Sequence, residues 1–294
     1  MGLFFSSDRF TRPGPGVRPD APRKKGVARL AEIMGRDMWN FFRAGFLAFL
    51  GCLPFIIGMF FAVETHALLF MLLAGIIGGL IAGPELSAMA DTVLRSLRDE
   101  PGYWWETYRR VWKRNARESL VPGMLTGLVL SMQIFTLFHM SVISAGIVTW
   151  VLLILSFVVT LGLESYIWPQ IALLDLPLYG ILKNSLLLFL GYLPRSLGAI
   201  AIKAVYWGTI LLFFPLTTII LPFTNFWLPM LPALLCIYQP LNKCFTIEST
   251  INKMREDELN AALAKDNEPL PEDPTERAEE STEAPSDDSS SDVQ

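Results

Sequence analysis

The feature that most constrains this chain is a series of long apolar runs between residues 44 and 246. Crossing a bilayer as a helix takes about 20 consecutive apolar residues, whereas a buried helix of a soluble protein rarely needs more than about 14. Several of the runs approach the longer value, so we expect an all-α fold, a polytopic transmembrane helical bundle of about six spans. The expected spans are 44–62, 67–83, 121–139, 144–168, 199–221 and 226–246.

The 24 lysine and arginine residues provide an independent test of this topology. Nine precede the first span, seven follow the second, three lie between the fourth span and the start of the fifth, and five follow the sixth. The links on the opposite side, near 64–66, 141–143 and 224–225, contain none. Because basic residues accumulate on cytoplasmic loops, we expect both termini to be cytoplasmic.

The two ends of the chain are polar but differ in charge. Residues 256–294 contain 14 Asp and Glu against Lys265 and Arg277, a net charge of −12, which leaves +8 for residues 1–255 because the whole chain carries −4. We expect a basic cytoplasmic segment over 1–40, a transmembrane domain over 41–250 and an acidic tail over 251–294. The tail is too polar to bury a core and is predicted to be disordered. No apolar run lies near the start, so no cleavable signal peptide is expected.

A basic and aromatic segment, 103–117, lies between the second and third spans. On a helix, Trp105, Tyr108 and Trp112 share one face, while Arg109, Lys113 and Arg117 share another. This pattern favours an interfacial helix at the headgroup level. Binding of nucleic acid is the alternative, but the position between two spans argues against a nucleic-acid partner and for contact with the lipid bilayer.

The segment 177–194 is apolar but interrupted by Lys183 and Asn184, and Gly191 and Pro194 end it. We interpret it as a second interfacial helix on the cytoplasmic side. A re-entrant half-helix is the alternative.

The stretch 74–85 reads AGIIGGLIAGPE. A phosphate-binding loop needs Gly-Lys-Ser/Thr after its glycines, whereas here Glu85 follows Gly83 and Pro84. Gly75, Gly79 and Gly83 instead recur every four residues and line one face of a helix. Small residues at that spacing allow close contact between membrane helices, so we predict a helix-packing face that ends in a kink at Pro84.

Ionisable groups inside spans are energetically costly and therefore informative. Glu164 lies in the fourth span, Glu85 and Asp91 follow the glycine run, and Lys203 lies early in the fifth span. Lys203 could pair with Glu164 or with Glu85. Such a buried polar cluster either fixes the register of the helices or forms a substrate or ion site.

The sequence contains no pattern typical of catalysis. His66 and His139 lie at span ends without a zinc-type constellation, and we expect solvated interfacial histidines. No nucleophile elbow or metalloprotease motif occurs, so we expect no enzyme activity, no metal and no cofactor. The cysteines are expected to be reduced and packed as small hydrophobes; they are Cys52, Cys236 and Cys244.

Several stretches resemble the YesL-like family of bacterial integral membrane proteins over roughly residues 1–250. The resemblance rests on FLGCLPFIIG at 49–58, on GPELSAMADTVLRSLRDEPGYW at 83–104, on the basic-aromatic run 108–117, and on Leu-Pro-Arg at 193–195. Glu85 departs from the family, which usually has alanine there, and about 25 extra residues separate the two halves of the Gly-Pro region. The resemblance implies a multi-pass protein of the bacterial plasma membrane, without an established biochemical activity.

Members of that family often occur beside carbohydrate-utilisation genes and sugar-type ABC importers. The first hypothesis is therefore a non-enzymatic accessory or scaffold for carbohydrate uptake, with a sugar ABC importer or another membrane protein as partner. The alternative is a transporter or an importer permease-like subunit with a polar site near Glu164. A solid, apolar bundle interior would argue against transport.

Overall fold

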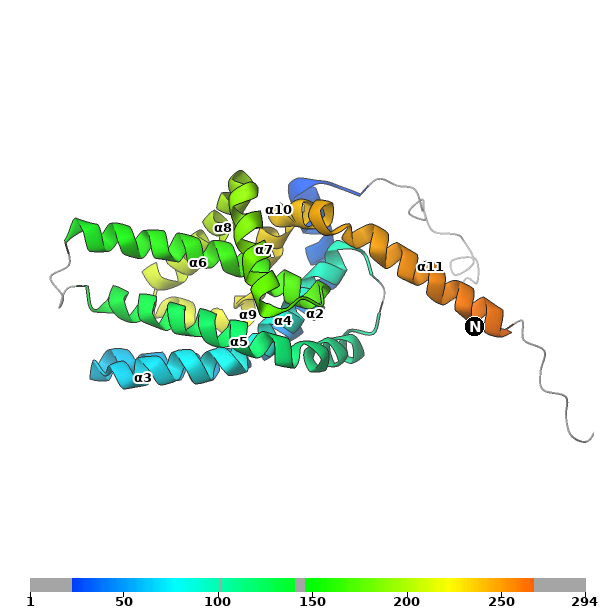
Figure 1. Ribbon diagram of the computed structural model, residues 1–294. Coiled ribbons are helices and arrows are strands. Elements are labelled where there is room, and N and C mark those ends of the chain that lie inside the picture. Colours follow the sequence, from blue (N-terminus) through cyan, green and yellow to red (C-terminus); the bar gives the residue numbers. More distant parts are fainter. Residues whose placement is uncertain (1–22, 101, 141–145, 267–294) are drawn as a thin grey trace, which may run out of the picture. The chain divides into compact units, whose positions relative to one another are not determined.

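The computed structural model describes residues 23–100, 102–140 and 146–266. Within these ranges the chain is built from helices, with no strand assigned (Figure 1). In chain order they are α2 (Gly26–Thr65), α3 (Leu68–Leu73), the π-helical turn η1 (Ala74–Gly78), α4 (Gly79–Leu97), α5 (Trp104–Phe138), α6 (Ile147–Leu173), α7 (Leu178–Gly191), α8 (Leu193–Leu212), the 3-10 turn η2 (Leu216–Thr218), α9 (Leu221–Thr224), α10 (Trp227–Phe245) and α11 (Ile247–Asp266).

Six helical segments in the described ranges are long and apolar enough to cross a membrane. They are Gly26–Thr65, Leu68–Arg98, Trp104–Phe138, Ile147–Leu173, Leu193–Leu212 and Leu221–Phe245. Their outward surfaces carry large apolar side chains, such as Leu152, Ile154 and Leu155 of α6, which are all more than half exposed. Contiguous apolar surface of this kind marks contact with a membrane. The expected all-α, multi-pass bundle is confirmed.

Two helices extend well beyond the spans expected from hydropathy. α2 begins at Gly26, so part of the expected 1–40 segment is helical; residues 1–22 lie outside the described ranges. α5 runs unbroken from Trp104 to Phe138, so the expected separate helix over 103–117 is instead the first part of the third span. The reason is that Pro122 is accommodated inside α5, although it lacks a backbone N–H. The Thr126 hydroxyl donates to the carbonyl of Pro122 at 2.8 Å.

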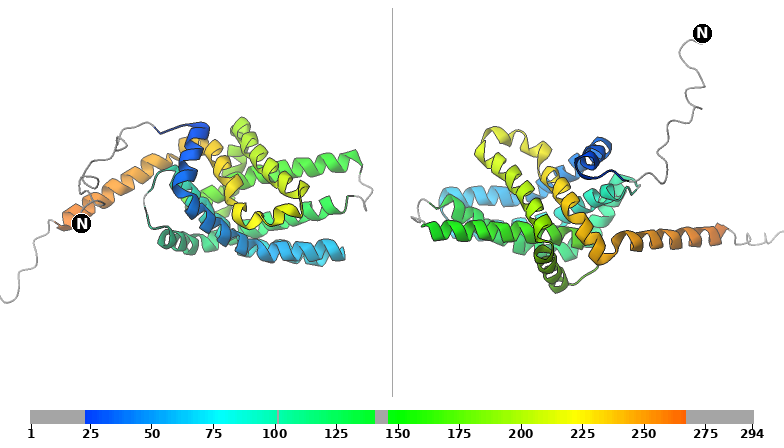
Figure 2. Two further views of the ribbon diagram at one scale, coloured as in Figure 1. Left: turned by 180° about the vertical axis from the view of Figure 1, so that it is seen from behind. Right: turned by 90° about the horizontal axis from the view of Figure 1, so that it is seen from above.

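The predicted packing face lies between η1–α4 and α5, which run side by side (Figures 1 and 2). A Cβ added to Gly79 would lie 2.9 Å from the carbonyl carbon of Gly123, and one added to Gly127 would lie 2.8 Å from Gly79 Cα. Gly75 and Gly83 are equally close to α5, near Ser131 and Ser119 respectively. Since real Cβ atoms do not approach so closely, these backbones touch only because the side chains are absent.

The partner stripe on α5 follows the same spacing, although the interpretation of the glycine run did not include it. Ser119, Gly123, Gly127 and Ser131 recur every four residues. We call this contact between η1–α4 and α5 the glycine seam. α4 continues through Pro84 to Leu97, and the Ser87 hydroxyl donates to the Pro84 carbonyl at 2.9 Å. The irregular turn of this span is η1, on the other side of Gly79.

Residues 246–294 form a unit of their own. α11 makes up its described part, so the expected disorder from residue 251 is wrong as far as Asp266. Helix-favouring residues of this segment, such as Glu256 and Lys253, explain the difference. The rest of the expected tail, 267–294, lies outside the described residues.

Candidate functional site

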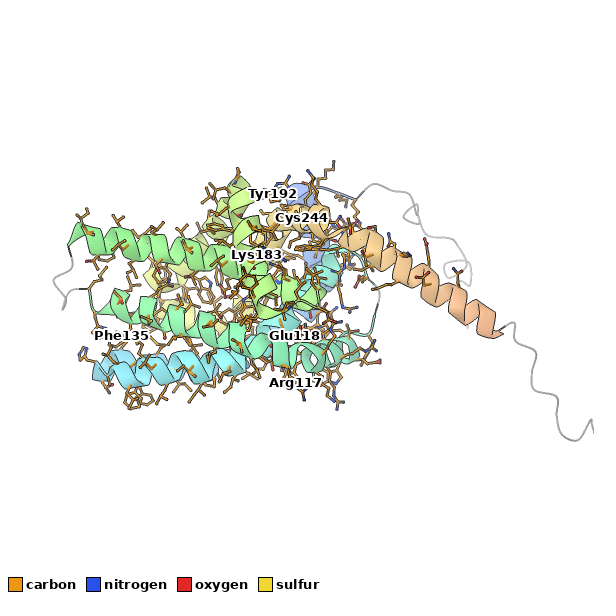
Figure 3. All side chains as sticks on the ribbon, viewed as in Figure 1. Arg117, Glu118, Phe135, Lys183, Tyr192 and Cys244 are labelled. Atoms are coloured by element: carbon orange, nitrogen blue, oxygen red, sulfur yellow. The ribbon has the colours of Figure 1, made fainter. Side chains whose placement is uncertain are left out.

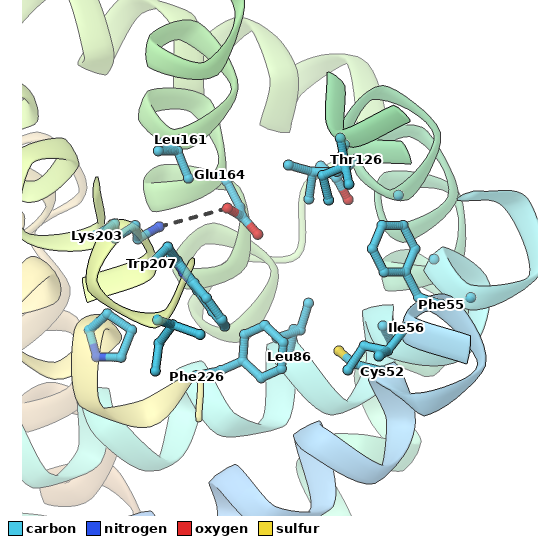
Figure 4. A pocket seen from close by; sticks show the side chains of 18 of the residues that line it. Cys52, Phe55, Ile56, Leu86, Thr126, Leu161, Glu164, Lys203, Trp207 and Phe226 are labelled. Carbon is cyan, nitrogen blue, oxygen red and sulfur yellow. Dashed lines mark ion pairs between the residues drawn. The ribbon is translucent and has the colours of Figure 1, made fainter. Parts of the chain in front are cut away.

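The transmembrane bundle contains a cavity of about 390 Å³ (Figure 4). This volume falls within the range of small-molecule sites. One wall is the glycine seam, and the others come from α2, α6, α8 and α10. Figure 4 shows Phe55, Ile56, Leu86, Leu161, Trp207 and Phe226 around the open space. The wall is therefore almost entirely apolar.

Glu164 of α6 and Lys203 of α8 supply the charges in this wall, and they face each other (Figure 4). Lys203 Nζ lies 3.9 Å from Glu164 Oε2, and the two side chains are 8% and 17% exposed. The distance is too long for a hydrogen bond. Trp168 Nε1 donates to the other oxygen, Glu164 Oε1, at 3.3 Å. Among the described residues, the Lys203 ammonium has this ion pair and no hydrogen bond.

Lys203 could have paired with either carboxylate, and the structure places it beside Glu164. Glu85 accepts hydrogen bonds from Tyr108 Oη at 2.5 Å and from Trp112 Nε1 at 2.9 Å. These two donors come from the first turns of α5, so Glu85 links α4 to α5 next to the glycine seam. In the described ranges it has no ion pair. Glu85 thus stabilises a helix contact, whereas Glu164 faces the cavity.

The segment 103–117, predicted to be interfacial, contains both exposed side chains and side chains that bind Glu85. Trp105, Arg109, Trp112 and Lys113 are exposed on α5, consistent with a position at the headgroup level. Tyr108 differs from them because it is buried and holds Glu85. The sequence could have indicated this, since Tyr108 and Trp112 are one helical turn apart and both can donate to a carboxylate.

Other polar side chains join the helices around the cavity, and the sequence interpretation did not include them. Gln133 Nε2 donates to Thr160 Oγ1 at 2.8 Å and joins α5 to α6. Gln170 Nε2 donates to Ser185 Oγ at 2.8 Å and joins α6 to α7. α7 has 14 residues, too few to cross a bilayer. Hydrogen bonds between buried amides and hydroxyls are expected where no water is present to satisfy them.

The arginine-rich end of the bundle is organised around Asp99, just beyond α4. Arg29 Nη2 donates to Asp99 Oδ2 at 2.6 Å, and Arg36 binds the other carboxylate oxygen. Burial alone would raise the pKa of Asp99, but hydrogen bonds and charge from Arg36 and Arg29 outweigh it and hold this pKa below its ordinary value. In the same region, Arg95 pairs with the buried Asp91 at 2.7 Å. Arg117 and Glu118 lie on this half of α5, far along the helix from Phe135 (Figure 3).

The remaining candidates are the cysteines and histidines. All three cysteines are free, and Cys52 is buried in the cavity wall. His66 and His139 are not separate solvated side chains: His66 Nδ1 lies 2.7 Å from His139 Nε2. No group of three or more His, Cys, Asp or Glu side chains suited to a metal ion occurs in the part of the chain that the structure describes.

The fold and the cavity define the class: a multi-pass, α-helical integral membrane protein with a largely apolar cavity inside the bundle. The chain matches no family model, no curated protein and no solved structure. Its function must therefore be argued from the cavity itself.

Proposed function

We propose that this protein is a non-enzymatic membrane protein that binds a small, mainly apolar molecule in the cavity, with the polar group of that molecule between Glu164 and Lys203. The observation that supports it is the ion pair at 3.9 Å facing an otherwise apolar space. A buried ammonium without a hydrogen bond is costly in a membrane. A ligand that supplies an acceptor would lower that cost.

The chemistry of the walls favours a ligand that dissolves in the membrane over a free sugar. A sugar would leave most of its hydroxyl groups unpaired against apolar side chains, at about 1–3 kcal/mol for each buried group. A single hydroxyl fits better, because it accepts from Lys203 and donates to Glu164. Since the two side chains carry opposite charges, the polar group is neutral. An aliphatic alcohol has this chemistry.

A ligand held in this cavity would support the transporter hypothesis over a purely structural role, because a substrate site inside the bundle is what that hypothesis requires. A role beside a sugar ABC importer in a bacterial plasma membrane is supported by the resemblance to the YesL-like family. Cytoplasmic termini are supported by the distribution of lysine and arginine. On that orientation the Asp99 end faces the cytoplasm.

A photoreactive probe tests the proposal. The protein, in lipid nanodiscs, is irradiated with a dodecanol that carries a diazirine, and labelled peptides are identified by mass spectrometry. We expect labels on the cavity faces of α5 and α8, and competition by unlabelled dodecanol. Lys203→Met should lower labelling, whereas Lys183→Met, which changes an exposed lysine of α7, should not. Labelling confined to the lipid-facing surface, unaffected by Lys203→Met, would contradict the proposal.

A further inference from the structure

The chain's two histidines meet at the end of the bundle opposite the Asp99 network. His66 follows α2 in the turn before α3, and His139 caps α5. Their rings are nearly perpendicular, with centroids 4.9 Å apart. The Phe135 ring stacks on His139 at 4.0 Å. The contact therefore joins the α2–α3 turn to the end of α5.

The hydrogen-bond partners fix where the protons lie. His139 Nδ1 is 2.7 Å from the carbonyl oxygen of Phe135, which can only accept, so Nδ1 carries the proton. In a neutral His139, Nε2 is then an acceptor. His66 Nδ1, at 2.7 Å, must be the donor to it. The outer nitrogen of His66, Nε2, is left as the site where the first additional proton can bind.

Successive protons have opposite effects on this contact. The first, on His66 Nε2, makes the His66 Nδ1–H a charged donor to a neutral acceptor, and charge-assisted hydrogen bonds are the stronger kind. The second must bind His139 Nε2. Two N–H groups, each on a cation, would then face each other, and the hydrogen bond would be lost. Histidine is the side chain that titrates in the physiological range.

Among the described residues, no other charged group faces the pair from the helices that form this end. α3 and η1 contain no charged residue, and α5 has none after Glu118. Glu64, near the end of α2, is exposed and makes no ion pair with either ring among the described residues. Any charge at this contact therefore comes from the two imidazoles themselves.

The contact also lies next to the cavity. Leu137 and Phe138, the two residues before His139, line it from α5, and Phe55 and Ile56 line it from α2. Loss of the contact would remove one link between the α2–α3 turn and α5, beside the apolar cluster of Met59, Ala62, Met71 and Ala74 that packs against Phe135. We propose that His66 and His139 form a proton-operated clasp, which holds with no added proton or with one, opens when both rings are protonated, and thereby opens this end of the cavity.

Cys52 is a built-in reporter, because it is buried and lines the cavity. In a Cys236→Ser, Cys244→Ser background, its labelling by 4,4′-dithiodipyridine is followed in nanodiscs from pH 8 to pH 4, with EDTA present so that no metal ion bridges the rings. We expect the ratio of labelling in the background protein to labelling in its His66→Asn variant to rise about tenfold from pH 8 to pH 4. About tenfold is the change in an equilibrium constant that corresponds to one charge-assisted hydrogen bond. Comparison at equal pH cancels the pH dependence of thiol chemistry.

His66→Asn is the informative variant, since His66 has a φ of 53° and asparagine tolerates that left-handed conformation. His139→Asn is a second variant, and Glu64→Gln is the matched control, which should keep the acid response. The melting temperature should hold or rise over the first protonation and fall over the second. An acid response in both histidine variants equal to that of the wild type, or its loss in Glu64→Gln, would overturn the proposal.

Discussion

The glycine seam and the cavity lie next to each other in the bundle, yet they differ in packing. In the seam, Gly79 and Gly123 let two backbones touch. On the far side of the cavity, α6 and α8 present large side chains such as Leu161 and Trp207, and a space of about 390 Å³ remains between the helices. Gly79, Gly123 and Gly127 belong to both regions, because they also line the cavity.

This difference shows that side-chain size determines where a membrane bundle is solid and where it is hollow. In lipid there is little hydrophobic force to press helices together, so close packing depends on small residues. Where such residues are paired on two helices, the contact is tight. Where they face bulky side chains, the helices stay apart. Added volume should therefore be harmful in the seam and tolerated in the cavity.

The largest expected effect is that of Gly79→Leu, which tests the tight region. Its side chain would meet the Gly123 backbone, and overpacking against backbone should destabilise by more than about 3 kcal/mol. Thermal unfolding in detergent measures the loss. Gly208→Leu is the matched control, because nothing lies within 4 Å of an added Cβ there. Equal melting temperatures for the two variants would show that the glycine seam is not a tightly packed region.

A smaller effect is expected for Asp99→Asn, at the charged end of the tightly packed half. The partly exposed network with Arg29 and Arg36 should contribute about 1 kcal/mol. Because this pKa is lowered in the folded state, the contribution is full above the ordinary carboxyl value of about 4 and is lost as the pH falls through the lowered pKa. Unfolding at pH 7 and in acid measures the difference, which should vanish in acid. A constant difference would show that charge is not the cause.

The smallest effect on stability is expected for Leu161→Phe, which tests the hollow region. The added ring can occupy the cavity, so stability should change by no more than about 0.5 kcal/mol, as for sites without a packing conflict. Photolabelling by the dodecanol probe should fall at the same time. Thermal unfolding and labelling are measured on the same preparation. A loss as large as that of Gly79→Leu would mean that the space is not available to an added side chain.

Much of the fold follows from local patterns in the sequence. Apolar runs of membrane length and the one-sided distribution of lysine and arginine predicted six spans, and the four-residue spacing of Gly75, Gly79 and Gly83 predicted a packing face. Helix ends were less predictable. Pro122 and the polar stretch before it suggested a helix start, but α5 continues through this region, and Asn115 and Ser119 are buried there.

The candidate site was only partly predictable. Glu164 and Lys203 are conspicuous because charges are costly in spans, but the choice between Glu164 and Glu85 as the partner of Lys203 depends on how α4, α6 and α8 are rotated. The histidine pair shows the same limit, since 73 positions separate its members along the chain.

The sequence by itself determined that this chain crosses a membrane, that its lysine and arginine residues gather on one side of the spans, and which face of the second span carries the glycines. The reason is that hydropathy and helical period are local properties. The tertiary structure alone decided that Gly123 and Gly127 complete the seam, that Lys203 faces Glu164 across a cavity, and that His66 meets His139. Each of these depends on contacts between residues far apart in the chain, and helix rotation, which sets such contacts, is determined by the packing of all the helices together.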